Sequence, residues 1–186
     1  MWGPKKRKKQ LPVRLTISLD QESLALIEHL QQKYKTSKAD IVRKAVSCLE
    51  VAEKVGVTSL DTIKACLDFL GKGEHVIVDV EHWRAIFKEI RRGSEEFWEK
   101  VREIGKHHWD EYYDKGLRTV REILEYVEKT NWYKLSVDSE RGFTLVLNVR
   151  EAKRFIRNFF EGLFEMSPHK VSITETDGKL RINVMA

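Results

Sequence analysis

Residues 13–19, Val-Arg-Leu-Thr-Ile-Ser-Leu, alternate strictly between apolar and polar side chains, which predicts a half-buried β-strand. The apolar face comprises Val13, Leu15, Ile17 and Leu19, and the polar face comprises Arg14, Thr16 and Ser18. The residues that follow, up to position 55, are predicted to form two helices, so no second strand lies within reach. Because backbone donors and acceptors beneath an apolar face must be paired, the strand needs a partner. The simplest partner is the same strand of a second copy, running antiparallel about a two-fold axis.

Such pairing would give a two-stranded ribbon that displays Arg14, Thr16 and Ser18 twice. A two-stranded ribbon fits the major groove of DNA, where side chains of these types contact base edges. We therefore interpret the segment as the part of the chain that reads DNA. A structural alternative stays open, in which 13–19 is an edge strand of a larger α+β domain.

Charge is distributed unevenly along the chain. Residues 1–56 contain 12 Lys and Arg against 6 Asp and Glu, whereas residues 57–186 contain 22 against 23. The basic excess therefore lies at the N-terminal end, as expected for polyanion binding. Residues 1–10 are predicted to be a flexible arm that grips the DNA backbone, with a solubilising tail as the alternative; the basic residues are Lys5, Lys6, Arg7, Lys8 and Lys9. Each phosphate contact should steepen the salt dependence of binding, with a slope of about −0.9.

Two amphipathic helices are predicted after the strand. Asp20 is placed to cap the first, over 21–34, and Ser37 to cap the second, over 38–55, with Gly56 as a C-cap. Their apolar stripes are wider than one pair of short helices can bury, which again requires a partner chain. The stripes comprise Leu24, Leu26, Ile27, Leu30 and Tyr34 in the first helix and Ile41, Val42, Ala45, Val46, Leu49 and Ala52 in the second.

The strand, the helix, the Lys-Thr-Ser-Lys turn and the second helix together resemble the ribbon-helix-helix (MetJ/Arc/CopG) superfamily over residues 11–55. The run Arg-Leu-Thr-Ile-Ser-Leu at 14–19 is especially similar to the CopG-like branch. This resemblance implies an intertwined dimer whose ribbon enters the major groove. It implies base contacts from Arg14, Thr16 and Ser18, and phosphate contacts from Ser37 and Lys38. The last two positions also follow from physics, since a helix N-terminus attracts anions.

Residues 57–186 are predicted to be a separate, helix-rich α+β domain for oligomerisation or effector sensing, C-terminal to the 11–56 domain. Helices are expected over 60–70, 80–92, 95–115, after Gly116, and over 150–164. The segment 75–79 is either a short apolar strand or the lead-in to the next helix. Alternating segments at 132–137, 143–149, 171–176 and 180–184 predict a β-β-α-β-β layer, with Asp177-Gly178 as a hairpin turn.

Glu103, His107 and Glu111 recur at every fourth position of one predicted helix, so they share a face. They are a weak candidate for metal coordination, and surface ion pairing is the commoner role of such residues. Nickel-responsive regulators belong to the superfamily that the N-terminal part resembles. Their closely spaced histidine ligands with a cysteine are not found in this sequence, so no cofactor is predicted.

Aromatic residues are frequent in the C-terminal part. Trp83, Trp98, Trp109 and Trp132 are expected to form core, with a small-molecule pocket as the alternative. The sequence contains no GxSxG, P-loop, GxGxxG or HExxH motif, so the chain is not predicted to be an enzyme.

The two cysteines, Cys48 and Cys66, each fall within a predicted helix without CxxC spacing. They are therefore interpreted as reduced core residues of a cytosolic protein. Arg14 and Asp20 interrupt any signal peptide, and no apolar run reaches the roughly 18 residues of a membrane span. The high share of charged residues, 34%, is compatible with a thermophilic or archaeal origin.

These observations predict a cytoplasmic transcriptional regulator, most simply a repressor. It would bind double-stranded DNA as a homodimer or a dimer of dimers, with no membrane partner, and a small-molecule effector is left open. An antitoxin or a plasmid partition or copy-control protein would use the same DNA-binding segment, and both stay open as alternatives. Antitoxin tails usually order only on binding, whereas the regular periodicity of 57–186 predicts a domain that folds alone.

Overall fold

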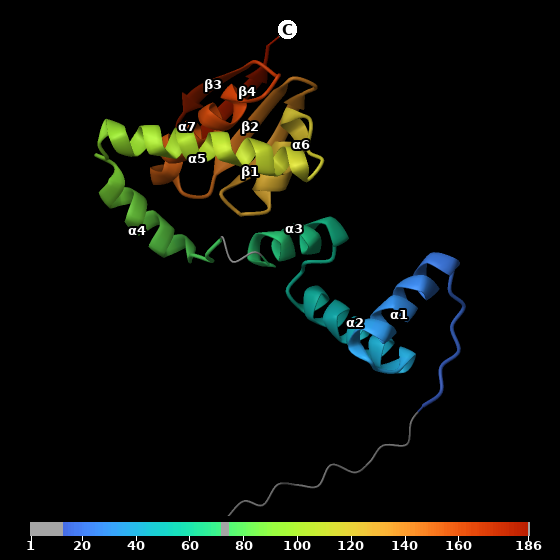
Figure 1. Cartoon of the computed structure of the whole chain (residues 1–186). Helices are drawn as coiled ribbons and strands as arrows, with labels where there is room; N and C mark the ends of the chain where they lie inside the picture. Colours follow the sequence, from blue (N-terminus) through green and yellow to red (C-terminus); the bar gives the residue numbers. More distant parts are fainter. Residues whose placement is uncertain (1–12, 72–74, 186) are drawn as a thin grey trace, which may run out of the picture. The chain divides into compact units, whose positions relative to one another are not determined.

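The computed structural model describes residues 13–71 and 75–185. These residues form seven α-helices, one short 3-10 helix and a four-stranded antiparallel sheet (Figure 1). The predicted α+β class is confirmed, and all the strands of the described residues belong to the C-terminal part. The chain divides into two compact units, Met1–Thr58 and Ser59–Ala186. No described helix combines the length and the apolar character that crossing a membrane requires.

The N-terminal unit contains a segment without regular secondary structure, 13–20, followed by α1 (Gln21–Tyr34) and α2 (Lys38–Lys54). Both predicted N-caps are confirmed. The Asp20 carboxylate accepts a hydrogen bond from Ser23 N (2.7 Å), and the Ser37 hydroxyl accepts one from Asp40 N (3.1 Å). Gly56 follows α2 with φ 75°, a left-handed conformation that glycine adopts without strain, as expected of a residue that ends a helix.

The N-terminal unit has almost no core of its own. Ile41 is the one buried side chain of its described residues, with 6% of its surface exposed. The apolar stripes of the two helices are open; their large exposed members are Leu24, Leu26, Tyr34, Val46 and Leu49. Cys48 is exposed as well, so its assignment to the core is wrong for the single chain, because nothing in the described unit covers that side of α2.

The C-terminal unit is helix-rich. Its helices are α3 (Leu60–Gly71), α4 (Val80–Ile90), α5 (Glu95–Asp114), α6 (Val120–Glu128), the 3-10 turn η1 (Arg150–Ala152) and α7 (Lys153–Glu165). Residues 75–79 form no strand and lead into α4, where the Asp79 carboxylate accepts a hydrogen bond from Glu81 N (2.8 Å). Of the two alternatives for this segment, the one in which it leads into the next helix is therefore correct. Cys66 lies on α3 and is half-buried.

The predicted β-β-α-β-β layer is confirmed. The strands are β1 (Tyr133–Ser139), β2 (Gly142–Leu147), β3 (Val171–Thr176) and β4 (Lys179–Val184). They form an antiparallel sheet in the order β1-β2-β4-β3, with Leu145 of β2 opposite Leu180 of β4. Both residues are fully buried, so the inner face of the sheet forms one side of the core. Gly178 has φ 66°, as the Asp-Gly hairpin turn requires.

Helix α7 packs on β3 and β4, and α5 packs on α7 over much of its length (Figure 1). Two glycines permit this close crossing. A Cβ atom on Gly105 would lie 2.1 Å from Phe159 O, and a Cβ atom on Gly162 would lie 2.0 Å from Arg102 O. Contacts this short are sterically excluded, so a larger residue at either position must push the helices apart. The crossing is flanked by the ion pairs Arg102–Glu161 (3.1 Å) and Lys106–Glu165 (2.9 Å).

Candidate nucleic-acid interface

The segment 13–19 is exposed on both of its faces. The apolar side chains Val13, Leu15, Ile17 and Leu19 are 94%, 82%, 49% and 45% exposed, respectively. The polar residues Arg14, Thr16 and Ser18 are exposed too, and no described residue forms a hydrogen bond or ion pair with their side chains. The ribbon expected from the sequence is therefore not formed within a single chain, because the described unit offers no second strand. The pairing of two copies stays a prediction.

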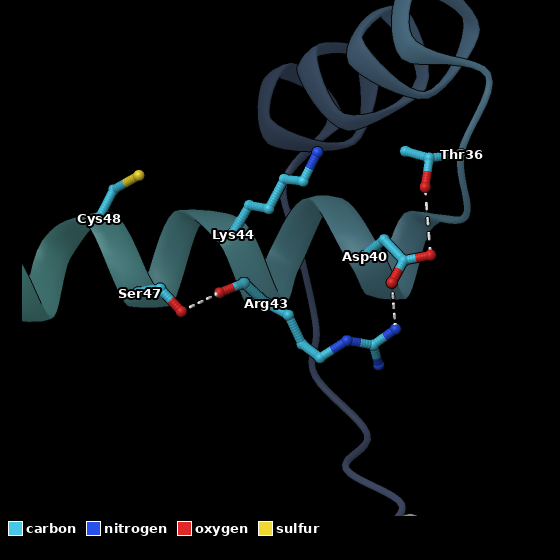
Figure 2. A pocket seen from close by; sticks show the side chains of 6 residues that line it. All are labelled: Thr36, Asp40, Arg43, Lys44, Ser47 and Cys48. Carbon is cyan, nitrogen blue, oxygen red and sulfur yellow. Dashed lines mark hydrogen bonds and ion pairs between the residues drawn. The ribbon is translucent and has the colours of Figure 1, made fainter.

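The N-terminus of α2 carries a carboxylate in its first turn. The Ser37 hydroxyl donates a hydrogen bond to Asp40 Oδ2 (2.7 Å). The Thr36 hydroxyl also donates to Asp40 Oδ2 (3.1 Å), and Arg43 forms an ion pair with Asp40 Oδ1 (Figure 2). These partners, with the Ser37 hydroxyl first, hold the pKa of the Asp40 carboxyl far below its ordinary value. Asp40 is thus negatively charged at neutral pH, at a helix end where a DNA phosphate is expected.

Lys38, the other predicted phosphate contact, is engaged with α1. Its Nζ lies 2.6 Å from Glu28 Oε1, and both side chains are about half exposed. An exposed ion pair of this kind contributes little stability, so exchange of the Glu28 carboxylate for a phosphate costs little. Ser37 is likewise placed at the helix start, with its side chain turned toward Asp40.

Further basic residues of α2 lie beside this helix end. Thr36, Asp40, Arg43, Lys44, Ser47 and Cys48 line an open hollow of about 660 Å³ (Figure 2). Lys44 Nζ lies 5.7 Å from the centre of the Tyr34 ring, and Lys33 Nζ lies 5.6 Å from it. Arg43 and Lys44 were not among the DNA contacts predicted from the sequence. No spacing in the sequence distinguishes these two residues from other basic residues on an exposed helix face.

The candidate site is therefore incomplete in one copy of the chain. No described hydrogen bond or ion pair joins Arg14, Thr16 or Ser18 to the α2 residues Ser37 and Lys38. Lys5, Lys6, Arg7, Lys8 and Lys9 lie outside the described residues. The described residues include an exposed row of Arg14, Thr16 and Ser18. They also include the basic start of α2, which carries the carboxylate of Asp40.

The metal candidate on α5 is not supported. Glu103 Oε2 lies 2.9 Å from Lys100 Nζ, and Glu111 Oε1 lies 2.8 Å from Lys115 Nζ. The carboxylates are thus occupied by neighbouring ammonium groups instead of converging with His107. Within 13–71 and 75–185, no three His, Cys, Asp or Glu side chains are grouped as a metal site would require.

The four tryptophans of the C-terminal unit separate into two pairs. Trp98 and Trp109 are buried in the core, where Trp98 Nε1 donates a hydrogen bond to Gly93 O (2.9 Å). Trp83 and Trp132 are half-buried, and their rings stack with centroids 6.0 Å apart beside a cavity. The prediction of core residues is therefore confirmed for Trp98 and Trp109. Trp83 and Trp132 instead line a cavity, which agrees with the alternative prediction of a pocket.

Comparison with known proteins assigns this site to no known family. Neither a scan against the models of known protein families nor a search of curated proteins found a match to the chain. The resemblance of residues 11–55 to ribbon-helix-helix proteins therefore stays a prediction from the residues of the N-terminal unit. Those residues are the exposed alternating row, the two capped helices and the turn between them.

Proposed function

We propose that the chain is a sequence-specific DNA-binding transcriptional regulator of the ribbon-helix-helix type, most simply a repressor. Two copies pair their 13–19 segments into an antiparallel ribbon. The observation that carries the proposal is the N-terminal unit itself, whose described residues include two well-capped helices but a single buried side chain. Exposed apolar faces of this extent on short helices favour association, because burial of apolar surface is the main driving force of folding and assembly.

Pairing of two copies accounts for both faces of the segment. Val13, Leu15, Ile17 and Leu19 of each copy become buried against the exposed stripes of α1 and α2. The opposite face then presents Arg14, Thr16 and Ser18 twice, and an arginine can form two hydrogen bonds with a guanine while Thr and Ser contact other base edges. The N–H groups at the start of α2, with Ser37 and Lys38, hold a phosphate, and the basic arm adds further backbone contacts.

The C-terminal unit supports a regulator over an antitoxin. Its core contains buried residues from five of its helices and three of its strands, with Ile156, Phe160 and Leu163 of α7 fully covered. A segment that orders only on contact with a toxin would lack such a core. We assign this unit the assembly or effector-sensing role.

Replacing Arg14 by alanine is expected to lower affinity for the preferred DNA sequence by about 10- to 100-fold and to relax the preference at one base per half-site. The preferred sequence is first selected from a random pool with the wild-type protein, and both proteins are then titrated at fixed salt concentration. Arg121→Ala on α6 is the matched control, since it removes an exposed arginine of the C-terminal unit. Lys6→Ala should weaken all sequences alike and flatten the salt slope. Unchanged affinity of Arg14→Ala, with loss of binding by Arg121→Ala, would contradict the assignment.

Replacing Asp40 by asparagine is expected to raise affinity for all DNA sequences about threefold at low salt, because it removes a negative charge beside the expected phosphate. It also releases Arg43 from its ion pair. Filter binding at several salt concentrations measures the effect. Glu50→Gln is the control, because it makes the same change of charge at the other end of α2, where Glu50 pairs with Lys54. An equal gain in both variants, or a loss in Asp40→Asn, would show that no phosphate lies at this helix end.

A further inference from the structure

A cavity of about 520 Å³ lies within the C-terminal unit, between α3, α4 and the start of β1. This volume is within the range of sites that bind small molecules. Most of its lining is apolar: Cys66, Phe69, Leu70, Val76, Ile77 and Val78, with the rings of Trp83 and Trp132. Neither the fold of the unit nor the proposed DNA contacts require such a space.

Stacked aromatic rings form one wall of the cavity. Trp83 of α4 and Trp132, which precedes β1, lie with ring centroids 6.0 Å apart and planes 22° from parallel. Phe155 of α7 supports both rings from behind, at 5.8 Å from Trp83 and 5.7 Å from Trp132. A wall made of two rigid, nearly parallel indoles suits a flat ring, which gains stacking energy at little conformational cost.

Among the described residues, the cavity lining carries charge of one sign. Lys129, at the end of α6, is a lining residue, and no described lining residue is an Asp or a Glu. The ammonium group of Lys129 forms no ion pair with a described residue. In a largely apolar site this charge favours an anionic ligand over a neutral or cationic one.

His75 provides an unsatisfied polar atom at the same cavity. Its Nδ1 is buried and has no hydrogen-bond partner among the described residues, although its ring is held edge-on to Phe69 with centroids 5.2 Å apart. Buried polar atoms are nearly always paired, so a turn of the imidazole ring that brings this atom to the cavity, where a ligand can pair it, is favourable.

Asn131 adds a second sign of a built site. It has φ 64°, a left-handed conformation that asparagine adopts more readily than most residues other than glycine. Asn148 holds it there, because the Asn148 amide donates to both Asn131 O (2.6 Å) and Asn131 Oδ1 (2.9 Å). Both asparagines line the cavity, next to Trp132. Two hydrogen bonds thus fix the position of Asn131 at the rim of the cavity.

We propose that this cavity binds a small aromatic monocarboxylate. Its ring lies against Trp83 and Trp132, Lys129 provides the counter-charge, and His75 Nδ1 forms a hydrogen bond with the ligand. The site is contained in the C-terminal unit, so the proposal does not depend on DNA binding by the N-terminal unit. A protein segment is a poorer occupant, since the cavity is lined by large rings around a space of ligand size.

The test uses the full chain and 2-naphthoate as the probe, with 2-naphthamide as its neutral counterpart. Titration is followed by calorimetry and by the indole N–H signals of the tryptophans in NMR spectra. Naphthoate is expected to bind with a 1:1 stoichiometry and to shift the Trp83 and Trp132 signals, whereas Trp98 and Trp109, which are core residues away from the cavity, stay unchanged. The amide should bind about tenfold more weakly, because it lacks the charge.

Two variants separate the parts of the proposal. Lys129→Gln should weaken naphthoate about tenfold and leave the amide unaffected, and Lys134→Gln on the exposed part of β1 is the control with the same change of charge. Trp83→Leu should weaken both probes, with the fold checked by circular dichroism. Equal binding of naphthoate to Lys129→Gln and wild type would overturn the carboxylate assignment. Absence of binding by either probe at millimolar concentration, with the Trp83 and Trp132 signals unmoved, would overturn the site.

Discussion

Alanine in place of Gly162 is expected to destabilise the C-terminal unit by about 3 kcal/mol, at the upper end of the cost of overpacking a core. The reason is the crossing of α5 and α7, where a Cβ atom at this position would lie 2.0 Å from the carbonyl oxygen of Arg102. A backbone atom cannot move aside as a side-chain end can, so the two helices must separate. Urea unfolding followed by the fluorescence of buried Trp98 and Trp109 measures the loss.

The matched control is Gly71→Ala. Gly71 is also a helical residue, the last of α3, but no described atom lies within 4 Å of the Cβ that alanine would add. This substitution is expected to be neutral or to stabilise by up to about 1 kcal/mol, because alanine is the better helix former. If Gly162→Ala unfolds at the same urea concentration as wild type, the described crossing of α5 and α7 is wrong.

Aspartate in place of Ile17 is expected to abolish both the dimer and DNA binding. Ile17 belongs to the apolar face that the proposed pairing buries, so each dimer would enclose two carboxylates without counter-charges. The cost of several kcal/mol per ion raises the dimer dissociation constant by at least about a thousandfold. Sedimentation equilibrium of the full chain gives the dissociation constant, and titration of the selected DNA gives the affinity.

Two other variants isolate this effect. Ile17→Val keeps an apolar β-branched side chain and should preserve both dimer and DNA affinity. Arg14→Ala should preserve the dimer and lose affinity for DNA, since Arg14 lies on the opposite face of the segment. Dimers of undiminished stability in Ile17→Asp would show that the 13–19 segments do not face each other.

Features set by neighbouring residues were predictable from the sequence. Asp20 and Ser37 cap their helices, because a short polar side chain before an apolar periodic run satisfies the free N–H groups of the first turn. The Asp177-Gly178 turn fixes the second hairpin in the same way, since its geometry depends on the two residues themselves. The order of strands in each hairpin then follows from short connections.

Features that depend on residues distant in the sequence were not predictable. Nothing in the sequence indicates a role for Gly105 or Gly162, because that role depends on the meeting of the backbones of α5 and α7. The tryptophans could not be separated by helical spacing, because Trp83 and Trp132 come together from different elements. Cys48 was assigned to the core because the period of α2 places it beside apolar neighbours, whereas the single chain leaves it exposed.

The candidate site was predicted in part. Ser37 and Lys38 lie at the start of α2 as expected, but the carboxylate of Asp40 that occupies the same turn was not anticipated. The effect of Asp40 on a bound phosphate depends on the groups that contact its carboxylate. These groups belong to three different side chains. Arg43 and Lys44 were overlooked because a basic residue on an exposed helix face has no distinctive spacing.

The pairing of two chains through residues 13–19 is tested most directly by intermolecular nuclear Overhauser effects. A sample is made from equal amounts of isotopically labelled and unlabelled full-length chains, and only contacts between the two kinds of chain are recorded. We expect backbone contacts in an antiparallel pattern between the 13–19 segments of two copies, with protection of alternate amides from exchange. A monomer at the concentration of the experiment, or a dimer without contacts between these segments, would contradict the proposed ribbon.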